Sequence, residues 1–310
     1  MPASPPTSRV IAVLEALAAS SDGIASAALA RSLGLSTSTV SLILGTLQDA
    51  HYVERLADKS YQLGPGLMRL LASLQNRFPI LGVANEELTQ LAARFGCGTN
   101  ISRVGREGQE VVLTAGPTEQ FGITPGVRVP IDPPHGTMSM AWRSHDEIEL
   151  WLSKVPTSIR GAYRKGLAVV RDLGFAVYGI RPDTGSMVDQ LRDLLNAIQT
   201  EHDADHLHDQ LDQLAAFVGS RIYTPADLAN PERKDVSHII APIFAADHNP
   251  RYLISLQVMK EAVSPDDLRA HIDALLKSAE TLTNQIGGQI QHQVAAHRPH
   301  IATRIPPIAC

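Results

Sequence analysis

A hydroxyl-rich stretch near the N-terminus is the part of the sequence whose chemistry is most specific. Six of its residues are candidates for contact with DNA: Ser36, Thr37, Ser38, Thr39, Ser41 and Leu42. Serine and threonine hydroxyls bond to phosphates and base edges, a helix N-terminus attracts phosphate, and leucine suits the methyl group of thymine. Two later cations, Arg55 and Lys59, are placed for phosphate or minor-groove contact. These residue types predict a surface that binds a duplex.

Patterns that would support catalysis or metal binding are weak. Ser139 lies near His135 but outside a G-x-S-x-G turn, and the sequence holds no G-x-x-x-x-G-K-[ST] loop. His202 and His206 have the spacing of one helix face, yet a polar junction between two helices explains them equally well. We expect no enzyme activity, no metal site and no cofactor.

The elements that must position the hydroxyl stretch are two helices joined by a tight turn. Residues 28–33 form the first predicted helix, Gly34 can take the left-handed conformation that ends it, and Ser36 caps a second helix over 36–49. The second helix should bury Val40, Ile43, Leu44 and Leu47. Residues 52–55 and 61–63 form a predicted two-stranded ribbon around the turn at 57–59. The pattern is that of a winged helix-turn-helix.

Residues 8–74 resemble the head of an IclR-type transcriptional regulator, most clearly in LARSLGLSTSTVSLILGTL and YVERLADKSYQLGPGLMRL. The resemblance implies a regulator that binds a palindromic operator in double-stranded DNA as a homodimer, or as a dimer of dimers. The family usually has basic residues at the positions of Thr37 and Leu42. This head therefore departs from the family pattern at two positions that are expected to contact DNA.

The charge of the head is the second departure. Residues 1–66 hold four cations and five acids, a net charge of −1: Arg9, Arg31, Arg55 and Lys59 against Glu15, Asp22, Asp49, Glu54 and Asp58. Few cations predict a shallow salt dependence for each head and reliance on dimerisation. A winged-helix module that binds another protein is the alternative interpretation.

Length and composition predict two folded parts that are not cross-linked by disulfide bonds. The chain has 310 residues, 44% hydrophobic residues, a net charge of −5 and two cysteines. A chain of this length and hydrophobic content can form two cores, and two cysteines are too few for a disulfide framework. No apolar run approaches the ~18 residues of a membrane span, and residues 1–7 lack a signal-like core. We expect a cytoplasmic protein that does not bind membranes.

A linker helix is predicted over residues 67–79, after the Gly64-Pro65-Gly66 break. Its stripe of Leu67, Leu70, Leu71 and Leu74 must be buried on something, and in IclR-type proteins the corresponding helix packs on the partner subunit. The larger part then alternates between helices and strands. Predicted helices cover residues 81–95, 146–152, 163–173 and 265–287, and predicted strands cover 100–104, 110–115, 127–131, 175–180, 238–244 and 252–258.

This order predicts an α+β effector domain, and the segments GLAVVRDLGFAVYGI, IIAPIF and YLISLQV resemble the GAF-like domain of IclR-type regulators. Residues 185–234 depart from that family, which usually has a short connection there. Leucine and isoleucine recur at helical spacing over 187–198 and 207–218, which predicts an inserted helical hairpin. It would either extend the core or cap the ligand site.

The resemblance also places an effector site in the larger part. The family stretches that line it correspond here to eight candidate residues: Met138, Ser139, Met140, Tyr178, Ile180, His238, Ser255 and Gln257. Methionine and aromatic side chains in place of small or acidic ones favour a larger, mainly apolar effector whose polar handles His238 and Gln257 would orient. The alternative is that these side chains fill a core and the pocket is small or lost.

These observations predict a ligand-responsive DNA-binding regulator that represses transcription. The expected parts are a winged helix-turn-helix domain over residues 1–66, a linker helix over 67–79, an effector-binding domain over 80–290 with an insertion at 185–234, and a flexible tail over 291–310.

Overall fold

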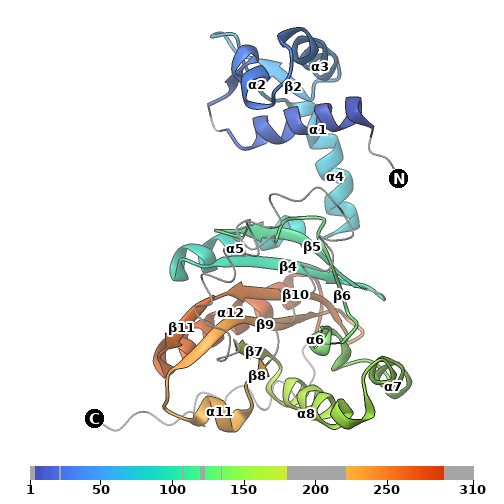
Figure 1. The fold of residues 1–310 in the computed structure, drawn as a ribbon, viewed down its shortest axis with the longest axis vertical. Helices are drawn as coiled ribbons and strands as arrows, with labels where there is room; N and C mark the ends of the chain where they lie inside the picture. Colours follow the sequence, from blue (N-terminus) through green and yellow to red (C-terminus); the bar gives the residue numbers. More distant parts are fainter. Residues whose placement is uncertain are drawn as a thin grey trace. The chain divides into compact units, whose positions relative to one another are not determined.

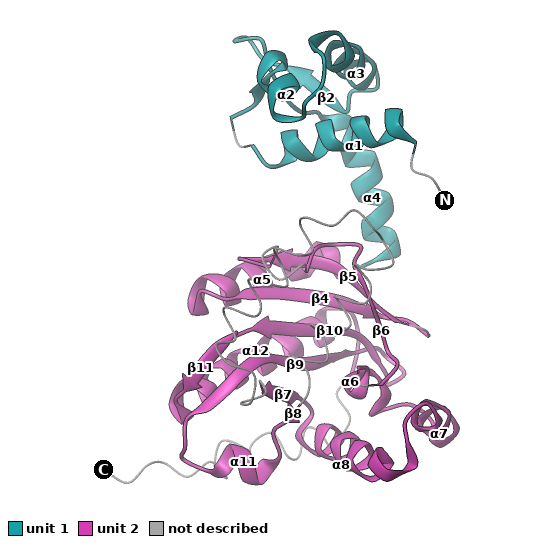
Figure 2. Cartoon of the chain, in the orientation of Figure 1, with its two compact units in different colours: residues 1–79 teal, residues 80–310 magenta. Residues whose placement is uncertain are grey.

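The structure is a computed structural model that describes residues 4–20, 22–106, 108–118, 123–133, 135–179 and 221–289. The chain divides into two compact units, Met1–Pro79 and Ile80–Cys310 (Figure 2). The predicted hairpin at 187–218 and the predicted tail at 291–310 lie outside the described residues.

The N-terminal unit is a helical head with a small sheet (Figure 1). Its helices and strands are α1 (Pro5–Ala18), β1 (Ile24–Ala25), α2 (Ser26–Ser32), α3 (Thr37–Asp49), β2 (Val53–Arg55), β3 (Ser60–Leu63), the 3-10 turn η1 (Pro65–Leu67) and α4 (Met68–Arg77). The sheet has the order β1-β3-β2 and is antiparallel. The helix-turn-helix and the ribbon agree with the prediction, whereas the two-residue strand β1 was not predicted because it is too short to show a period.

One apolar core joins the three helices of the head to the ribbon. Its buried side chains include Val13, Leu17, Leu29, Val40, Leu44, Leu47 and Val53. Where the chain leaves the ribbon, a Cβ on Gly64 or Gly66 would lie 2.5 or 2.6 Å from the His51 carbonyl oxygen. Only glycine fits that close approach, so the Gly-Pro-Gly break fixes the start of α4.

The second unit is built on an antiparallel sheet in the order β6-β5-β4-β10-β9-β7-β8, with β11 paired to β9. Its strands are β4 (Gly98–Val104), β5 (Gly108–Ala115), β6 (Arg128–Pro130), β7 (Ala176–Gly179), β8 (Arg221–Ile222), β9 (Lys234–Phe244), β10 (Pro250–Gln257) and β11 (Lys260–Val263). Strands from distant parts of the sequence meet at its centre, where β10 pairs with both β4 and β9.

Helices pack on both faces of this sheet. They are α5 (Leu81–Phe95), α6 (Thr137–Met140), α7 (His145–Ser153), α8 (Thr157–Leu173), α11 (Pro225–Ala229) and α12 (Pro265–Gln285). Side chains of α5 and α12 share one core with Val177 and Ile254, and those of α6, α7 and α8 share the other with Tyr178 and Leu253. Successive residues of a strand point to opposite faces, which produces this division. The α+β fold class predicted from the sequence is confirmed.

The start of α8 differs from the prediction. The helix begins at Thr157 rather than at residue 163, in a stretch without apolar periodicity. Tertiary contacts explain the longer helix, since the Arg160 guanidinium donates to the carbonyls of Val155 and Ser153, 3.0 and 3.2 Å away. Those bonds satisfy backbone acceptors at the end of α7 and hold the first turn of α8.

Among the described residues, no single helix is both long enough and apolar enough to span a membrane, and the only combination that is so by length and composition is α2 with α3, bent by 119° at the turn between them.

Candidate functional site

The turn and cap before α3 set the direction of this helix. Gly34 has a φ of 63°, the left-handed conformation predicted for it. The Ser36 hydroxyl accepts a hydrogen bond from the Thr39 backbone N–H at 3.1 Å and lies 2.9 Å from Ser38 Oγ and 2.8 Å from Thr39 Oγ1. Ser36 therefore caps the helix, and Thr39 is half-buried beside it.

The outer face of α3 carries the remaining hydroxyls of the predicted strip. Thr37, Ser38 and Ser41 are exposed, and the Leu42 side chain is 75% exposed, while Val40, Leu44 and Leu47 on the opposite side are buried. The helix thus presents an uncharged surface of small polar groups with a single leucine on it.

The ribbon and its turn carry the two predicted cations. Arg55 and Lys59 are exposed, and the Arg55 guanidinium lies over the Tyr61 ring, 5.8 Å from its centroid. Asp58 accepts hydrogen bonds from the Ser60 hydroxyl and backbone N–H at 2.6 and 2.9 Å, and these bonds lower the pKa of its carboxyl group. An ionised Asp58 therefore offsets part of the positive charge of the tip.

A polar cluster lies on the sheet face that packs against α6 and α8. Gln257 Nε2 donates to Asn100 Oδ1 at 3.0 Å and to Ser255 Oγ at 2.9 Å, and Asn100 Nδ2 donates to Ser102 Oγ at 3.2 Å. All four side chains are buried. We call this set, Asn100, Ser102, Ser255 and Gln257, the amide cluster.

Sequence reasoning found Ser255 and Gln257 but missed Asn100 and Ser102. The alternation Asn-Ile-Ser in β4 was a usable signal, because Ile101 belongs to the opposite core and its two neighbours must share the other face. β4 and β10 bring the halves together by pairing Asn100 with Ser255.

A stacked aromatic pair lies further along the same face. The rings of Tyr178 and His238 have centroids 4.4 Å apart and planes 9° apart, and Ser237 Oγ lies 3.0 Å from His238 Nδ1. Burial raises the pKa of Tyr178. Burial, and next the nearby His135, lower the pKa of His238 to about 4. Both rings are therefore uncharged at neutral pH.

The short helix α6 supplies three more candidates. Ser139 is buried and accepts a hydrogen bond from Gln109 Nε2 at 2.9 Å. Met138 and Met140 belong to the same core as Tyr178 and Leu253. α6 is held by Gly136, whose φ is 82° and where a Cβ would lie 2.2 Å from the Ile131 carbonyl oxygen.

Of the eight predicted effector residues, seven lie on or beside this face, and the eighth, Ile180, lies outside the described residues. The amide cluster, the Tyr178–His238 pair and Ser139 offer hydrogen-bonding atoms, whereas the two methionines offer apolar surface. One face of the sheet therefore gathers buried polar and apolar side chains whose polar atoms bond to one another.

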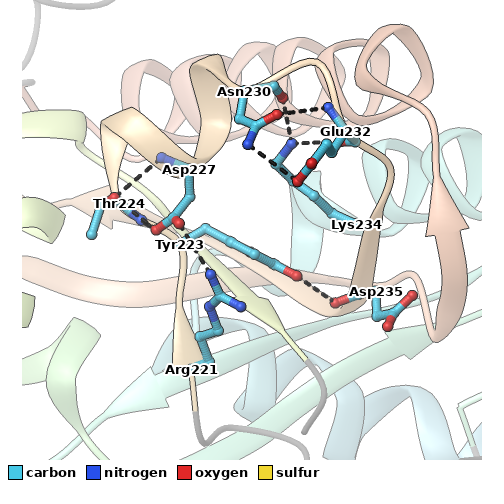
Figure 3. Close-up of polar contacts among 8 residues, drawn as sticks. All are labelled: Arg221, Tyr223, Thr224, Asp227, Asn230, Glu232, Lys234 and Asp235. Atoms are coloured by element: carbon cyan, nitrogen blue, oxygen red, sulfur yellow. Dashed lines mark hydrogen bonds and ion pairs between the residues drawn. The ribbon is translucent and has the colours of Figure 1, made fainter. Parts of the chain in front are cut away.

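A second polar cluster, at the end of the predicted insertion, is satisfied by its own contacts (Figure 3). Lys234 Nζ donates to the carbonyls of Asn230 and Glu232 at 2.7 and 2.8 Å, and the Tyr223 hydroxyl donates to the Asp235 carbonyl at 3.1 Å (Figure 3). Arg221 and Asp227 form an ion pair at 3.0 Å. These contacts anchor β8 and α11 to β9.

The described residues hold no group of three or more His, Cys, Asp or Glu side chains that could bind a metal ion. His202 and His206, which have the spacing of one helix face, lie outside the described residues.

The geometry defines a winged helix-turn-helix head joined in sequence to an α+β unit. Residues 6–57 match the family model of the IclR helix-turn-helix domain. The head of this chain is therefore an IclR-type helix-turn-helix domain, as the resemblance indicated. No curated protein matches the chain.

Solved structures of IclR-type proteins share low sequence identity with the chain. A putative IclR transcriptional regulator from Silicibacter sp. TM1040 is 19% identical, with a TM-score of 0.47 over 93% of this chain and 98% of its own. The Thermotoga maritima IclR is 15% identical, with a TM-score of 0.45 over 91% and 99%. An IclR homologue from Microbacterium hydrocarbonoxydans, in complex with 4-hydroxybenzoate, is 16% identical, with a TM-score of 0.45 over 91% and 99%.

Proposed function

We propose that the protein is a homodimeric transcriptional regulator that represses its target, binds a palindromic operator through its two heads and responds to a small organic effector. The observation that carries the proposal is the exposed hydroxyl face of α3 within an IclR helix-turn-helix domain. Thr37, Ser38 and Ser41 would meet phosphates and base edges from a helix set in the major groove.

The wing completes the proposed DNA interface. Arg55 and Lys59 are exposed near its tip and would contact phosphates or the minor groove beside the α3 site. Ser36 caps the helix by accepting the Thr39 backbone N–H, and the other N–H groups of the first turn would face phosphate.

The effector would bind the sheet face formed by the amide cluster, Ser139 and the Tyr178–His238 pair. Buried amides and hydroxyls recognise hydrogen-bonding groups, and the neighbouring Met138 and Met140 suit apolar surface. These residues support an effector that is mainly apolar and carries one or two uncharged polar groups.

The response would be a shift between arrangements of the two heads. Half-sites of a palindrome lie near multiples of ~10 base pairs, so only some arrangements match both. The effector can bias them only through its different affinity for each, typically ~1–3 kcal/mol of coupling.

A charge placed on the α3 face tests the proposal. Ser38→Asp puts a carboxylate against phosphate and should abolish binding of a selected operator duplex in a fluorescence anisotropy titration. An acidic residue in the first helical turn does not weaken the helix, so lost binding would not reflect unfolding. Ser158→Asp, at an exposed position of α8, is the matched control. Operator affinity unchanged in Ser38→Asp would contradict the docking of α3 on DNA.

The effector half of the proposal has a separate test. A thermal-shift screen should include uncharged aromatic and alicyclic compounds, their carboxylates and 4-hydroxybenzoate. A ligand that binds only the folded state raises stability by RT ln(1 + [L]/Kd). Effector affinity should survive Ser38→Asp, and operator affinity should change when the effector binds.

A head that binds another protein is the second candidate function. It is favoured by the net charge of −1 over residues 1–66 and by the exposed Leu42 side chain. Failure of the purified protein to enrich any duplex from a random library would favour it over DNA binding.

A further inference from the structure

The outermost strip of α3 has an unusual composition for a helix surface. On a helix with 3.6 residues per turn, Ser38, Ser41, Leu42 and Gly45 fall on the side opposite the buried Val40 and Leu47. Leu42 is 75% exposed, the highest value for a large hydrophobic side chain among the described residues. Between Thr37 and Gln48 the helix has no charged side chain.

Gly45 has no explanation within the head. A Cβ built at this position meets nothing within 4 Å, and the residue is exposed. Glycine inside a helix costs roughly 0.5–1 kcal/mol relative to alanine. At Gly64 and Gly66 the neighbouring backbone excludes a side chain, but at Gly45 only an external partner would do so.

The chemistry of the strip selects among base edges. Guanine is most often read by arginine or lysine, which α3 lacks, whereas thymine carries an apolar methyl group in the major groove. Leucine buries a methyl group well and offers nothing to the acceptor atoms of guanine. The four cations of residues 4–66, Arg9, Arg31, Arg55 and Lys59, lie outside α3, where they can meet phosphates.

We propose that α3 reads thymine in the major groove, with Leu42 against the thymine methyl group and Gly45 where the helix backbone approaches the groove most closely. This inference rests on the proposed function, since it specifies what the DNA interface recognises. Ser38 and Ser41 flank the contact and bond to neighbouring base edges or phosphates.

The experiment begins with the full-length protein and a random duplex library. The enriched half-sites should share one or two invariant A·T pairs. In the best duplex each thymine is then replaced by uracil, which removes only the methyl group. At one position the substitution should weaken binding by the wild-type protein about fourfold, the change expected for one buried methyl group.

Two variants assign that effect to residues. Leu42→Ala should bind the thymine duplex more weakly and should no longer distinguish it from the uracil duplex, as a double-mutant cycle requires. Ile11→Ala, at a position of α1 that is 50% exposed, should keep the full uracil effect.

Gly45→Ala separates stability from recognition. It should raise the melting temperature, because alanine favours the helix and meets no neighbour, yet weaken binding to the selected duplex about tenfold. The control is Gly161→Ala in α8, a position that is also exposed and has nothing within 4 Å of its Cβ position. It should stabilise the protein without changing DNA affinity.

Three results would overturn the proposal while leaving the regulator function intact. These are selected half-sites without an invariant thymine, a uracil effect that persists in Leu42→Ala, and wild-type affinity in Gly45→Ala. Wild-type DNA binding by both Leu42→Ala and Gly45→Ala would show that the strip does not contact DNA. If no duplex is enriched at all, the proposed function itself fails, which is a distinguishable outcome.

Discussion

The phenol of Tyr178 lies flat against the imidazole of His238, with ring centroids 4.4 Å apart. β7 and β9 pair these two residues directly, so backbone register rather than chance packing sets the stack. Protonation of the half-buried His238 ring would place a cation where solvation is poor, and burial together with His135 accordingly lowers its pKa to about 4. Proton binding on this face is therefore linked to folding.

Acidification should destabilise the protein between the unfolded and folded pKa values of His238. Above pH 6.5 the imidazole is neutral in both states, whereas below it the unfolded chain takes up a proton that the folded chain refuses until about pH 4. The free energy of unfolding therefore decreases as the pH drops through this window, by on the order of 2 kcal/mol. Urea unfolding at several pH values measures the loss.

His238→Gln should remove part of that acid dependence. His271, stacked on Phe95, also has a pKa lowered by burial, so its contribution in the same direction remains. His145→Gln, at an exposed position, is the control and should leave the acid dependence as in the wild type. An acid profile unchanged in His238→Gln would show that His238 is not the group responsible.

Replacement of Gln257 by an apolar residue should lower the free energy of unfolding, because its polar partners would stay buried without a donor. Gln257→Leu deprives Asn100 Oδ1 of its donor at 3.0 Å, and an unsatisfied buried group costs roughly 1–3 kcal/mol. The free energy of unfolding from chemical denaturation measures the loss. The double variant Gln257→Leu/Asn100→Leu should recover part of it, and a double variant worse than the sum of the singles would contradict this interpretation.

The contrast between α3 and the amide cluster shows what the sequence could predict. α3 was predictable because its cap, its glycine turn and its buried face are local signals within about a dozen residues. The amide cluster depends on the pairing of β4 with β10, which brings Asn100 to Ser255 across a long stretch of sequence. No local pattern specifies such a partner, so half of the cluster was missed.

Strand and helix ends were also less predictable than their centres. β9 begins at Lys234 rather than at residue 238. Its first residues are held in the sheet by pairing with β11, and their own sequence shows no strand pattern. Lysine side chains are usually exposed, but Lys234 is buried, with its ammonium group bound to backbone carbonyls.

Lys234→Met should destabilise the second unit by roughly 1–3 kcal/mol. The substitution keeps the length of the side chain but removes the donor to the Asn230 and Glu232 carbonyls (Figure 3), and those acceptors lose their partner. Thermal unfolding followed by circular dichroism measures the effect. Lys165→Met, on the exposed side of α8, is the matched control and should change stability little. Equal melting temperatures for the two variants would rule out a role for Lys234 in anchoring β8 and α11.

Salt dependence should reveal how few phosphates each head neutralises. Each neutralised phosphate contributes a slope of about −0.9 to the plot of log affinity against log salt. Arg55→Gln and Lys59→Gln should each make the slope about 0.9 less steep for every head in the complex. Arg164→Gln in α8, outside the head, should leave the slope unchanged. Slopes unaltered by both wing variants would remove the wing from the interface.

The linker helix α4 should mediate association between two copies of the chain. None of its residues is buried, and Met68, Leu70, Leu71 and Leu74 are between 40% and 61% exposed. An apolar stripe of this kind marks an interaction site rather than a solvated surface. We therefore expect Leu71→Gln/Leu74→Gln to halve the mass measured by sedimentation, without loss of helix, because glutamine is a good helix former.

Loss of the dimer in the Leu71→Gln/Leu74→Gln variant should also weaken DNA binding. Two linked heads bind the second half-site at a high effective concentration, so the monomeric variant should lose at least ~100-fold in operator affinity. Asn76→Gln, at an exposed position on the side of α4 away from Leu71 and Leu74, controls for the substitution itself and should stay dimeric. If the Leu71→Gln/Leu74→Gln variant kept the wild-type mass, association would have to use another surface, and the exposed stripe of α4 would need a different partner.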